Sequence, residues 1–407
     1  AERRAFWAEL FSGTKLSVAH CEGKGVGVFV SSAIAEGDVL FGEDPEAAFQ
    51  WRTTPLACEH CMRLVGCLDF QMRLLGDPAA RPRPREPPML PVLEDSQRRL
   101  SDDALSGWAA WRGEAWFCSK ECEARHRDEF GSLVGQEDAV REFVAHALET
   151  KTPFFVVALK LLLRGGHAQR YLLHKPYWEC VDVPEGEDPA AFEQEMRGDL
   201  QASWALLSRL KIARKPSSMD EYARLVGALC LNAVAVKYAH PLIYYIQEVD
   251  QGIGGPAAKR ALRPALEAAR LERLRRAAAT RAAAGPAASD ESEGSGSDGA
   301  ESESDEEDDE LQFSWAFKRG ALDFSSRLFP PMKGYGLYAR LSAVNHSCDP
   351  SAEVLFTGSN HLLLVAKRPL AVGEEVSISY IDHEAEDREE RQRNLVSYGF
   401  RCDCRRC

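Results

Sequence analysis

The sequence predicts a mixed α+β protein in which strands from the two ends of the chain flank a helical middle region. A glycine-rich stretch at 22–30 is followed by the apolar run Ile34–Phe41, and both are typical of short strands joined by turns. A further alternating strand follows a Gly-Glu-Glu turn at 373–375 and ends at Tyr380. Between these ends, residues 137–250 show the helical spacing of apolar side chains.

The composition of the chain excludes several classes of protein. Its 407 residues suffice for two domains or for one large, elaborated domain. Because no run of about 18 apolar residues occurs, we expect no membrane-spanning helix. The net charge is −13, but twelve acidic residues lie between Asp290 and Glu310, and without them the net charge would be −1. A nearly neutral body argues against a nucleic-acid-binding surface, so we expect no sequence-specific contact with nucleic acid.

The twelve cysteines are spaced for metal binding rather than for disulfides. There is a C-x2-C pair at 58–61, a C-x3-C pair at 118–122 and a C-x-C-x2-C group at 402–407. Thiolates at such spacings are typical of metal ligands in a reducing compartment. We therefore expect a cytoplasmic or nuclear protein.

The C-terminal cysteine group needs one more ligand, because structural Zn²⁺ is held by four. Cys348 is the obvious donor, and a metal that joined it to the chain end would hold that end against Asn345–His346. The predicted site consists of Cys348, Cys402, Cys404 and Cys407.

Three motifs together resemble the SET domain of protein lysine methyltransferases. They are Asn345-His346-Ser347-Cys348, the strand that ends at Tyr380, and the C-terminal cysteine group, which resembles a post-SET zinc segment. The hairpin at 22–30 resembles the first SET hairpin, whose backbone lies along S-adenosylmethionine; glycines there let the backbone approach closely. The resemblance implies a SET β-fold.

The resemblance also implies roles for individual residues. Tyr380 would orient the amine and the methyl group, and Tyr398 would line the lysine channel; both are catalytic. Phe400 would pack on the adenine. For Asn232, a capping or solvent-facing role is the alternative. The implied cofactor-binding residues are Lys24, Gly25, Val26, Gly27, Asn232, Asn345, His346, Tyr380 and Phe400.

The two earlier cysteine pairs resemble half of a MYND zinc finger, which the SET-and-MYND (SMYD) family inserts within its SET domain. The positions of the second ligand set hold alanine and glycines, such as Ala110 and Gly113. We therefore expect a degenerate finger with one zinc, and two zinc ions in the whole chain. A further site made from His60, Cys67 and His126 is the alternative. The predicted finger ligands are Cys58, Cys61, Cys118 and Cys122.

The chain can be divided on these grounds. Helices are expected at 154–163, 192–210 and 219–236. The acidic run has nothing to bury, so it predicts disorder. The segments are an N-terminal SET half at 15–55, a degenerate MYND-type finger with a Pro-rich loop at 56–135, a helical SET insert at 136–255, a basic helix at 256–284, a disordered acidic linker at 285–311, a catalytic SET half at 312–395 and a post-SET zinc segment at 396–407.

We expect no helical repeat region after Cys407, and on that expectation the resemblance is closest to the fifth SMYD branch and the plant SET proteins grouped with it. It implies S-adenosylmethionine-dependent methylation of a lysine in a protein substrate. That substrate would be a histone tail or another basic protein, ribosomal proteins included. We expect a monomer. The alternative function is a catalytically inactive SET/MYND module that binds other proteins.

Overall fold

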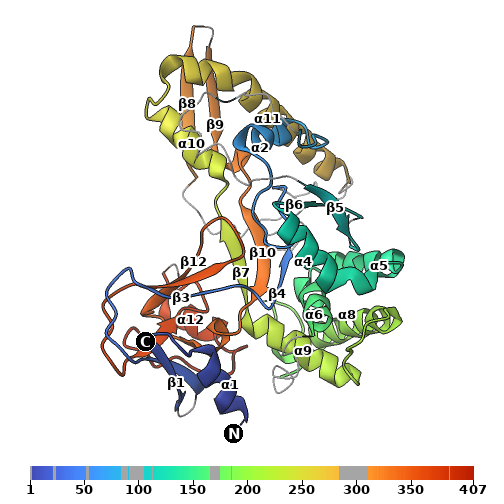
Figure 1. Ribbon diagram of the computed structural model, residues 1–407, viewed down its shortest axis with the longest axis vertical. Helices are drawn as coiled ribbons and strands as arrows, with labels where there is room; N and C mark the ends of the chain where they lie inside the picture. The colour runs from blue at the N-terminus through green and yellow to red at the C-terminus, as the bar shows by residue number, and fades with distance from the viewer. Residues whose placement is uncertain are drawn as a thin grey trace.

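The computed structural model describes residues 2–21, 24–51, 55–83, 90, 105–111, 113–165, 175–184, 186–283, 310–318, 320–384 and 386–407. Figure 1 shows three regions along the longest axis: a β-sheet body near both chain ends, helices beside it, and a lobe at the far end. Most of the predicted acidic linker and much of the Pro-rich loop lie outside the described residues.

The two ends of the chain fold together into three small sheets. The first contains β1 (Leu16–Cys21), β2 (Gly25–Val30), β14 (Glu375–Ile378) and β11 (Asn345–His346); the second contains β12 (Ala352–Phe356), β13 (Leu362–Ala366) and β3 (Val39–Glu43); the third contains β4 (Ala47–Gln50), β10 (Met332–Leu337) and β7 (Ala233–Tyr238). Antiparallel pairing places Val28 of β2 opposite Val376 of β14, and both side chains are fully buried. The N-terminal hairpin therefore lies beside the C-terminal strands.

Two helices, α6 (Pro153–Arg164) and α9 (Met219–Asn232), contact the third sheet. Two more pack beside them, α5 (Glu137–Glu149) against α6 and α8 (Pro189–Arg209) against α5 and α9. The apolar run predicted at 154–163 is α6, which contacts β4, α5 and α9. This helix begins with Pro153, whose fixed φ suits the first turn, and ends before Gly165, whose φ of +67° lies in the left-handed region.

The prediction of a helix through Val236 was wrong. The helix α9 ends at Asn232, and Ala233–Tyr238 forms strand β7 instead. The valines at 234 and 236 are β-branched, and β7 pairs along its whole length with β10. This strand later supplies a wall of the candidate site.

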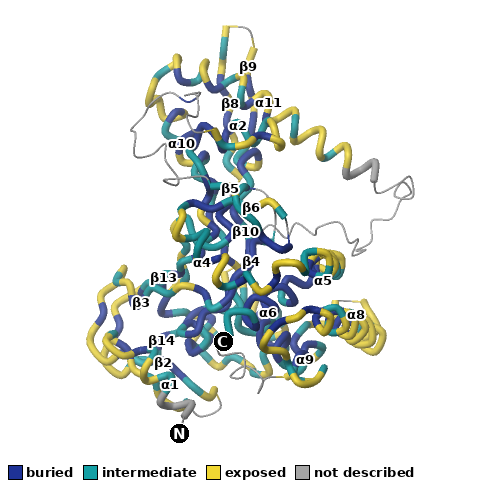
Figure 2. The backbone as a smooth tube through the Cα atoms, turned by 45° about the vertical axis from the view of Figure 1, so that its right-hand side comes forward, coloured by how far each residue is buried: buried dark blue, intermediate teal, exposed yellow. Residues whose placement is uncertain are grey.

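The far lobe has its own hydrophobic core, and apart from α2 its helices and strands lie between β7 and β10 in the sequence. It contains α2 (Leu68–Gly76), α10 (Pro241–Asp250), α11 (Gly255–Ala283), β8 (Gln312–Phe317) and β9 (Gly320–Ser325). Trp315 is 1% exposed, and its indole N–H donates to Asp250 Oδ1 at 2.7 Å. Along the first half of α11 buried and exposed residues alternate, and toward its end the described residues are mostly exposed, as Figure 2 shows.

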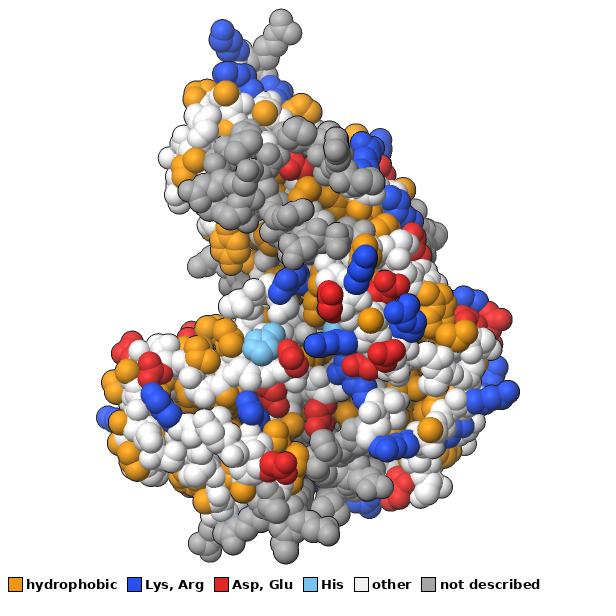
Figure 3. Space-filling view, viewed as in Figure 1, with side chains coloured by type: hydrophobic (Ala, Val, Ile, Leu, Met, Phe, Trp, Pro, Cys, Tyr) orange, Lys and Arg blue, Asp and Glu red, His pale blue; other side chains and the backbone are white. Residues whose placement is uncertain are grey.

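The remaining elements are α1 (Glu2–Leu10), β5 (Leu105–Ala109), β6 (Gly113–Phe117), α4 (Lys120–Phe130) and α12 (Arg388–Asn394). Among the described residues, no helix combines the length and apolarity that a bilayer crossing requires. On the face shown in Figure 3, cationic and anionic side chains are interspersed over the body.

Candidate active site

The turn of the first hairpin meets the Asn345 segment because β2 carries a glycine at the crossing point. A Cβ on Gly27 would lie 2.4 Å from Cys21 Sγ and 3.1 Å from Asn345 Nδ2. Gly25 has a φ of +83°, which favours glycine at the strand start. Lys24, beside it, is exposed.

The Asn345 side chain is fixed by two acceptors. Its Nδ2 donates to the Val26 carbonyl at 3.1 Å and to Glu375 Oε1 at 2.8 Å. The other oxygen of Glu375 lies 3.5 Å from Lys24 Nζ. Cys21 Sγ donates to Glu375 Oε1 at 3.6 Å, and burial, followed by the Glu375 charge, raises the pKa of this thiol. The Glu375 carboxylate thus links Asn345 to Lys24 and Cys21 of the first hairpin.

His346 connects Tyr380 to the C-terminal cysteines. The backbone N–H of Tyr380 donates to His346 Nδ1 at 3.0 Å, and Nε2 lies 3.2 Å from Cys348 Sγ. Because Nδ1 accepts, the ring proton resides on Nε2 and points at the sulfur. Burial lowers the pKa of His346 to about 4, so the ring is neutral at neutral pH.

The predicted aromatic residues form one cluster with this histidine. The ring centroids of Tyr380 and Tyr398 are 5.0 Å apart, and those of His346 and Phe400 are 5.8 Å apart. The Tyr380 hydroxyl donates to the Val344 carbonyl at 2.7 Å. Burial raises the pKa of both tyrosines, so both hydroxyls stay protonated. A hydroxyl that donates once still has lone pairs that accept.

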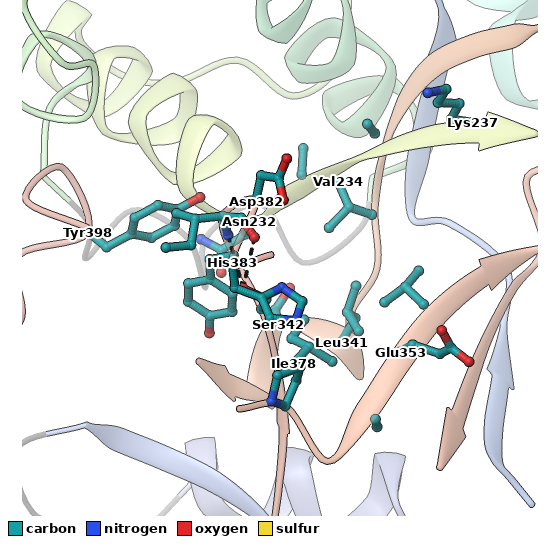
Figure 4. Close-up of a pocket in the computed structure, with 18 of the residues that line it drawn as sticks. Asn232, Val234, Lys237, Leu341, Ser342, Glu353, Ile378, Asp382, His383 and Tyr398 are labelled. Carbon is teal, nitrogen blue, oxygen red and sulfur yellow. Dashed lines mark hydrogen bonds between the residues drawn. The ribbon is translucent and has the colours of Figure 1, made fainter. Parts of the chain in front are cut away.

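A groove of about 690 Å³ opens beside this cluster. Figure 4 shows Tyr398 and Asn232 at one end and Glu353 at the other. The Asn232 amide donates to the Ala228 carbonyl at 2.8 Å, which fits the capping role at the end of α9. The other lining residues include Val234 and Ala235 of β7, Leu341, Ile378 and Tyr380, and the charged Lys237, Glu353, Lys367, Asp382 and Glu384. Asn232 thus lines the same groove as Tyr380 and Tyr398. Contact between Asn232 and the cofactor stays a prediction.

The four cysteines predicted at the C-terminal site come together. Their sulfurs lie within 4.8 Å of one another, and Cys348 and Cys407 are 3.5 Å apart. With Zn–S bonds of about 2.3 Å, a tetrahedral ion separates its sulfurs by about 3.8 Å, so the set fits Zn²⁺. The buried Arg391 side chain lies beside this group: burial lowers the pKa of its guanidinium, but interactions with Cys407 and Cys348 outweigh this and raise it. Gln392 bonds both the N–H and the carbonyl of Cys402.

The finger cysteines form a second group of four, Cys58, Cys61, Cys118 and Cys122. Ser119 caps α4 and thereby orients Cys122, because its hydroxyl accepts from the Cys122 N–H. His126 is 1% exposed and packs against Trp111 and Phe130, with centroids 5.3 and 4.8 Å away. Among the described residues, neither four-cysteine group includes His60, Cys67 or His126.

Beneath the finger, Lys160 forms a buried ion pair with Glu59, 3.4 Å from Nζ to Oε1. Both side chains are 3% exposed, and Trp111 Nε1 also donates to Glu59 at 2.8 Å. Removing one charge of a buried pair leaves the other uncompensated, so Lys160→Met should lower the free energy of unfolding by about 3–5 kcal/mol. Denaturant titration at fixed zinc concentration would measure this. A Glu59→Gln/Lys160→Met double variant should lose less; an equal or larger loss would contradict the ion-pair account.

Sequence reasoning missed Glu375 and Arg391. Glu375 was visible only as part of a turn, since its partners Asn345 and Lys24 are distant in sequence and meet only through strand pairing. Arg391 lies on the buried side of α12. It stands eleven residues before Cys402, and other arginines are closer to the cysteines in the sequence, so no pattern in the sequence indicated its position.

Comparison with family models matches the SET domain to residues 25–381. A 74-residue segment is 47% identical to the human "Histone-lysine N-methyltransferase SMYD3", covering 18% of this chain and 17% of that protein. A 79-residue segment is 42% identical to the chicken "Protein-lysine N-trimethyltransferase SMYD5", covering 18% and 19%. The Arabidopsis thaliana "Histone-lysine N-methyltransferase ATXR2" is 25% identical over 341 residues, covering 72% of this chain and 60% of that protein. The matched segments thus span less than a fifth of these SMYD proteins.

Proposed function

Because this chain belongs to the SET-domain family, we propose that it transfers methyl groups from S-adenosylmethionine to lysine side chains of proteins. One observation supports this most strongly: the hairpin loop, Asn345–His346 and Tyr380 lie in one bonded network beside a groove. A protein-binding module has no need for that convergence.

The side chains at and around the hairpin loop suit a cofactor that carries both an amino-acid group and an adenine ring. Lys24 supplies a cation, the Asn345 amide oxygen supplies an acceptor, and Phe400 supplies a ring for stacking. When bound, S-adenosylmethionine supplies a sulfonium methyl group that a nucleophilic amine can accept. At Gly25 the backbone is exposed and no protein atom lies within 4 Å of the place of a Cβ, so a ligand can approach it there; Gly27 is buried and lets Cys21 and Asn345 approach instead.

The groove can make the amine of a substrate lysine nucleophilic and orient it. Val234, Leu341 and Ile378 give it apolar walls, and desolvation lowers the pKa of an entering lysine, which favours the neutral nucleophile. The Tyr380 hydroxyl, held by the Val344 carbonyl, accepts from that amine and orients it. Tyr398 closes the side of the channel.

We also propose that each four-cysteine group holds one Zn²⁺, and that the C-terminal ion fixes the segment carrying Tyr398 and Phe400. The substrate is a basic protein, such as a histone tail or a ribosomal protein, because the groove has three carboxylates, Glu353, Asp382 and Glu384, against two lysines, Lys237 and Lys367. We also propose a cytoplasmic or nuclear location, since metal-bound thiolates suit a reducing compartment. The monomeric state stays a proposal.

Incubation with fractionated cell lysate and methyl-labelled cofactor tests this function. We expect label on protein, recovered after hydrolysis as methylated lysine and located by mass spectrometry. Label on another amino acid would contradict the proposed acceptor. A chain that neither binds the cofactor nor transfers label would instead be an inactive interaction module.

A further inference from the structure

Glu375 gathers three separate segments around one carboxylate. It begins β14, and its side chain reaches over Gly27 of β2. Its Oε1 accepts from Asn345 Nδ2 at 2.8 Å and from Cys21 Sγ at 3.6 Å, while Oε2 lies 3.5 Å from Lys24 Nζ. Its side chain is 27% exposed, so the carboxylate is largely shielded from solvent.

These contacts determine how the Asn345 amide is oriented. A primary amide has two N–H donors and one carbonyl acceptor. Both donors are used, one by the Val26 carbonyl and one by Glu375. Since both neighbours accept only, the flipped amide would place its oxygen against two oxygens. Among the hydrogen bonds of the described residues, none uses Asn345 Oδ1, so this oxygen is the atom offered to a ligand.

Lys24 is held more loosely. Its side chain is 45% exposed and its contact with Glu375 is long, at 3.5 Å. An exposed ion pair of this kind contributes little to stability. The Lys24 ammonium can therefore turn toward a ligand carboxylate at little cost in free energy. Without a ligand, it stays beside Glu375.

We propose that Glu375 is a positioning residue for the amino-acid end of the cofactor. By holding both donors of Asn345, it presents Oδ1 to the ligand ammonium, and by holding Lys24 it places a cation for the ligand carboxylate. This inference rests on the proposed function, because it concerns the same cofactor. It predicts that Glu375 selects for ligands that carry the amino-acid group.

A purely structural role predicts something different. The pairing of β14 with β2 is anchored by Val28 and Val376, which are fully buried without help from Glu375. If Glu375 only held the strands, its loss would weaken all ligands of the site equally. The two roles are separated by comparing ligands with and without the amino-acid group.

The test is calorimetric titration of the full chain with S-adenosylhomocysteine and with 5′-methylthioadenosine, which lacks the amino-acid group. Glu375→Met keeps the side-chain length but removes both acceptors; Glu375→Ala serves if that variant does not fold. We expect affinity for S-adenosylhomocysteine to fall roughly 10- to 100-fold, because a hydrogen bond to a charged group is lost. Affinity for 5′-methylthioadenosine should change less than about twofold.

Two further variants complete the design. Glu375→Gln retains an oxygen for the Asn345 amide and should restore most of the affinity for S-adenosylhomocysteine. Glu374→Ala removes the neighbouring carboxylate, whose partners are Arg368 and the Ala371 N–H, and should leave both affinities unchanged. Equal losses for both ligands in Glu375→Met, or no loss for either, would overturn the inference. Absence of S-adenosylhomocysteine binding by the wild-type chain would contradict the proposed function instead.

Discussion

Replacing Tyr380 by phenylalanine should slow methyl transfer by about 10²- to 10³-fold. The ring remains, so its packing on Tyr398 and His346 is kept. Only the hydroxyl that we propose to orient the amine is lost. Cofactor affinity should change little, because Asn345, His346 and the hairpin loop are untouched. Single-turnover rates and equilibrium affinity, measured on the same preparation, separate the two effects.

Tyr338→Phe is a matched control for this variant. The Tyr338 hydroxyl also donates to a backbone carbonyl, that of Asn360, at 2.6 Å, and its side chain is fully buried. It does not line the groove. The control should lose stability but keep the wild-type rate. Transfer by Tyr380→Phe at the wild-type rate would show that the hydroxyl has no part in the reaction.

Breaking the proposed C-terminal zinc site should lower both the rate of methyl transfer and the affinity for the cofactor. Cys407→Ser breaks the four-cysteine group that holds Cys348, and with it the contact from His346 Nε2. The segment carrying Tyr398 and Phe400 is then released. A displacement of about 1 Å at a reacting group costs on the order of 100-fold in rate, so we expect at least that loss. Elemental analysis should give one zinc per chain for this variant and two for the wild type.

Cys67→Ser is the control for the metal prediction. Cys67 precedes α2 at its N-cap position, where serine is well accepted, and it belongs to neither cysteine group. This variant should keep two zincs and the wild-type rate. Three zincs in the wild type would mean that a further site exists in the finger. An unchanged rate for Cys407→Ser would break the link between the metal and the groove.

The parts of the site that could be predicted are those where chemistry restricts the choice. Four thiolates satisfy one Zn²⁺, so Cys348 could be assigned to the C-terminal group across more than fifty residues, and the structure brings its sulfur to 3.5 Å from Cys407. The SET resemblance carried by Asn345–Cys348 and Tyr380 is confirmed by the family match. The cysteine group and the SET motifs could both be recognised because metal binding and the SET fold require particular residues at particular spacings.

The parts that could not be predicted depend on long-range packing. The segment 233–236 suits either a helix or a strand by composition, and its pairing with β10, about a hundred residues later, decides the outcome. The far lobe is similar, since its core joins Leu68 and Met72 of α2 to Trp315 of β8. The position of Glu375 beside Asn345 likewise follows from sheet order rather than from local pattern.

A crystal structure of the chain with S-adenosylhomocysteine tests the central claim most directly. The account predicts the amino-acid end of the ligand at Asn345 Oδ1 and Lys24, and its sulfur beside the Tyr380 hydroxyl. It also predicts anomalous scattering from zinc at both four-cysteine groups. A ligand bound elsewhere on the chain, or with its sulfur turned away from Tyr380, would contradict the account.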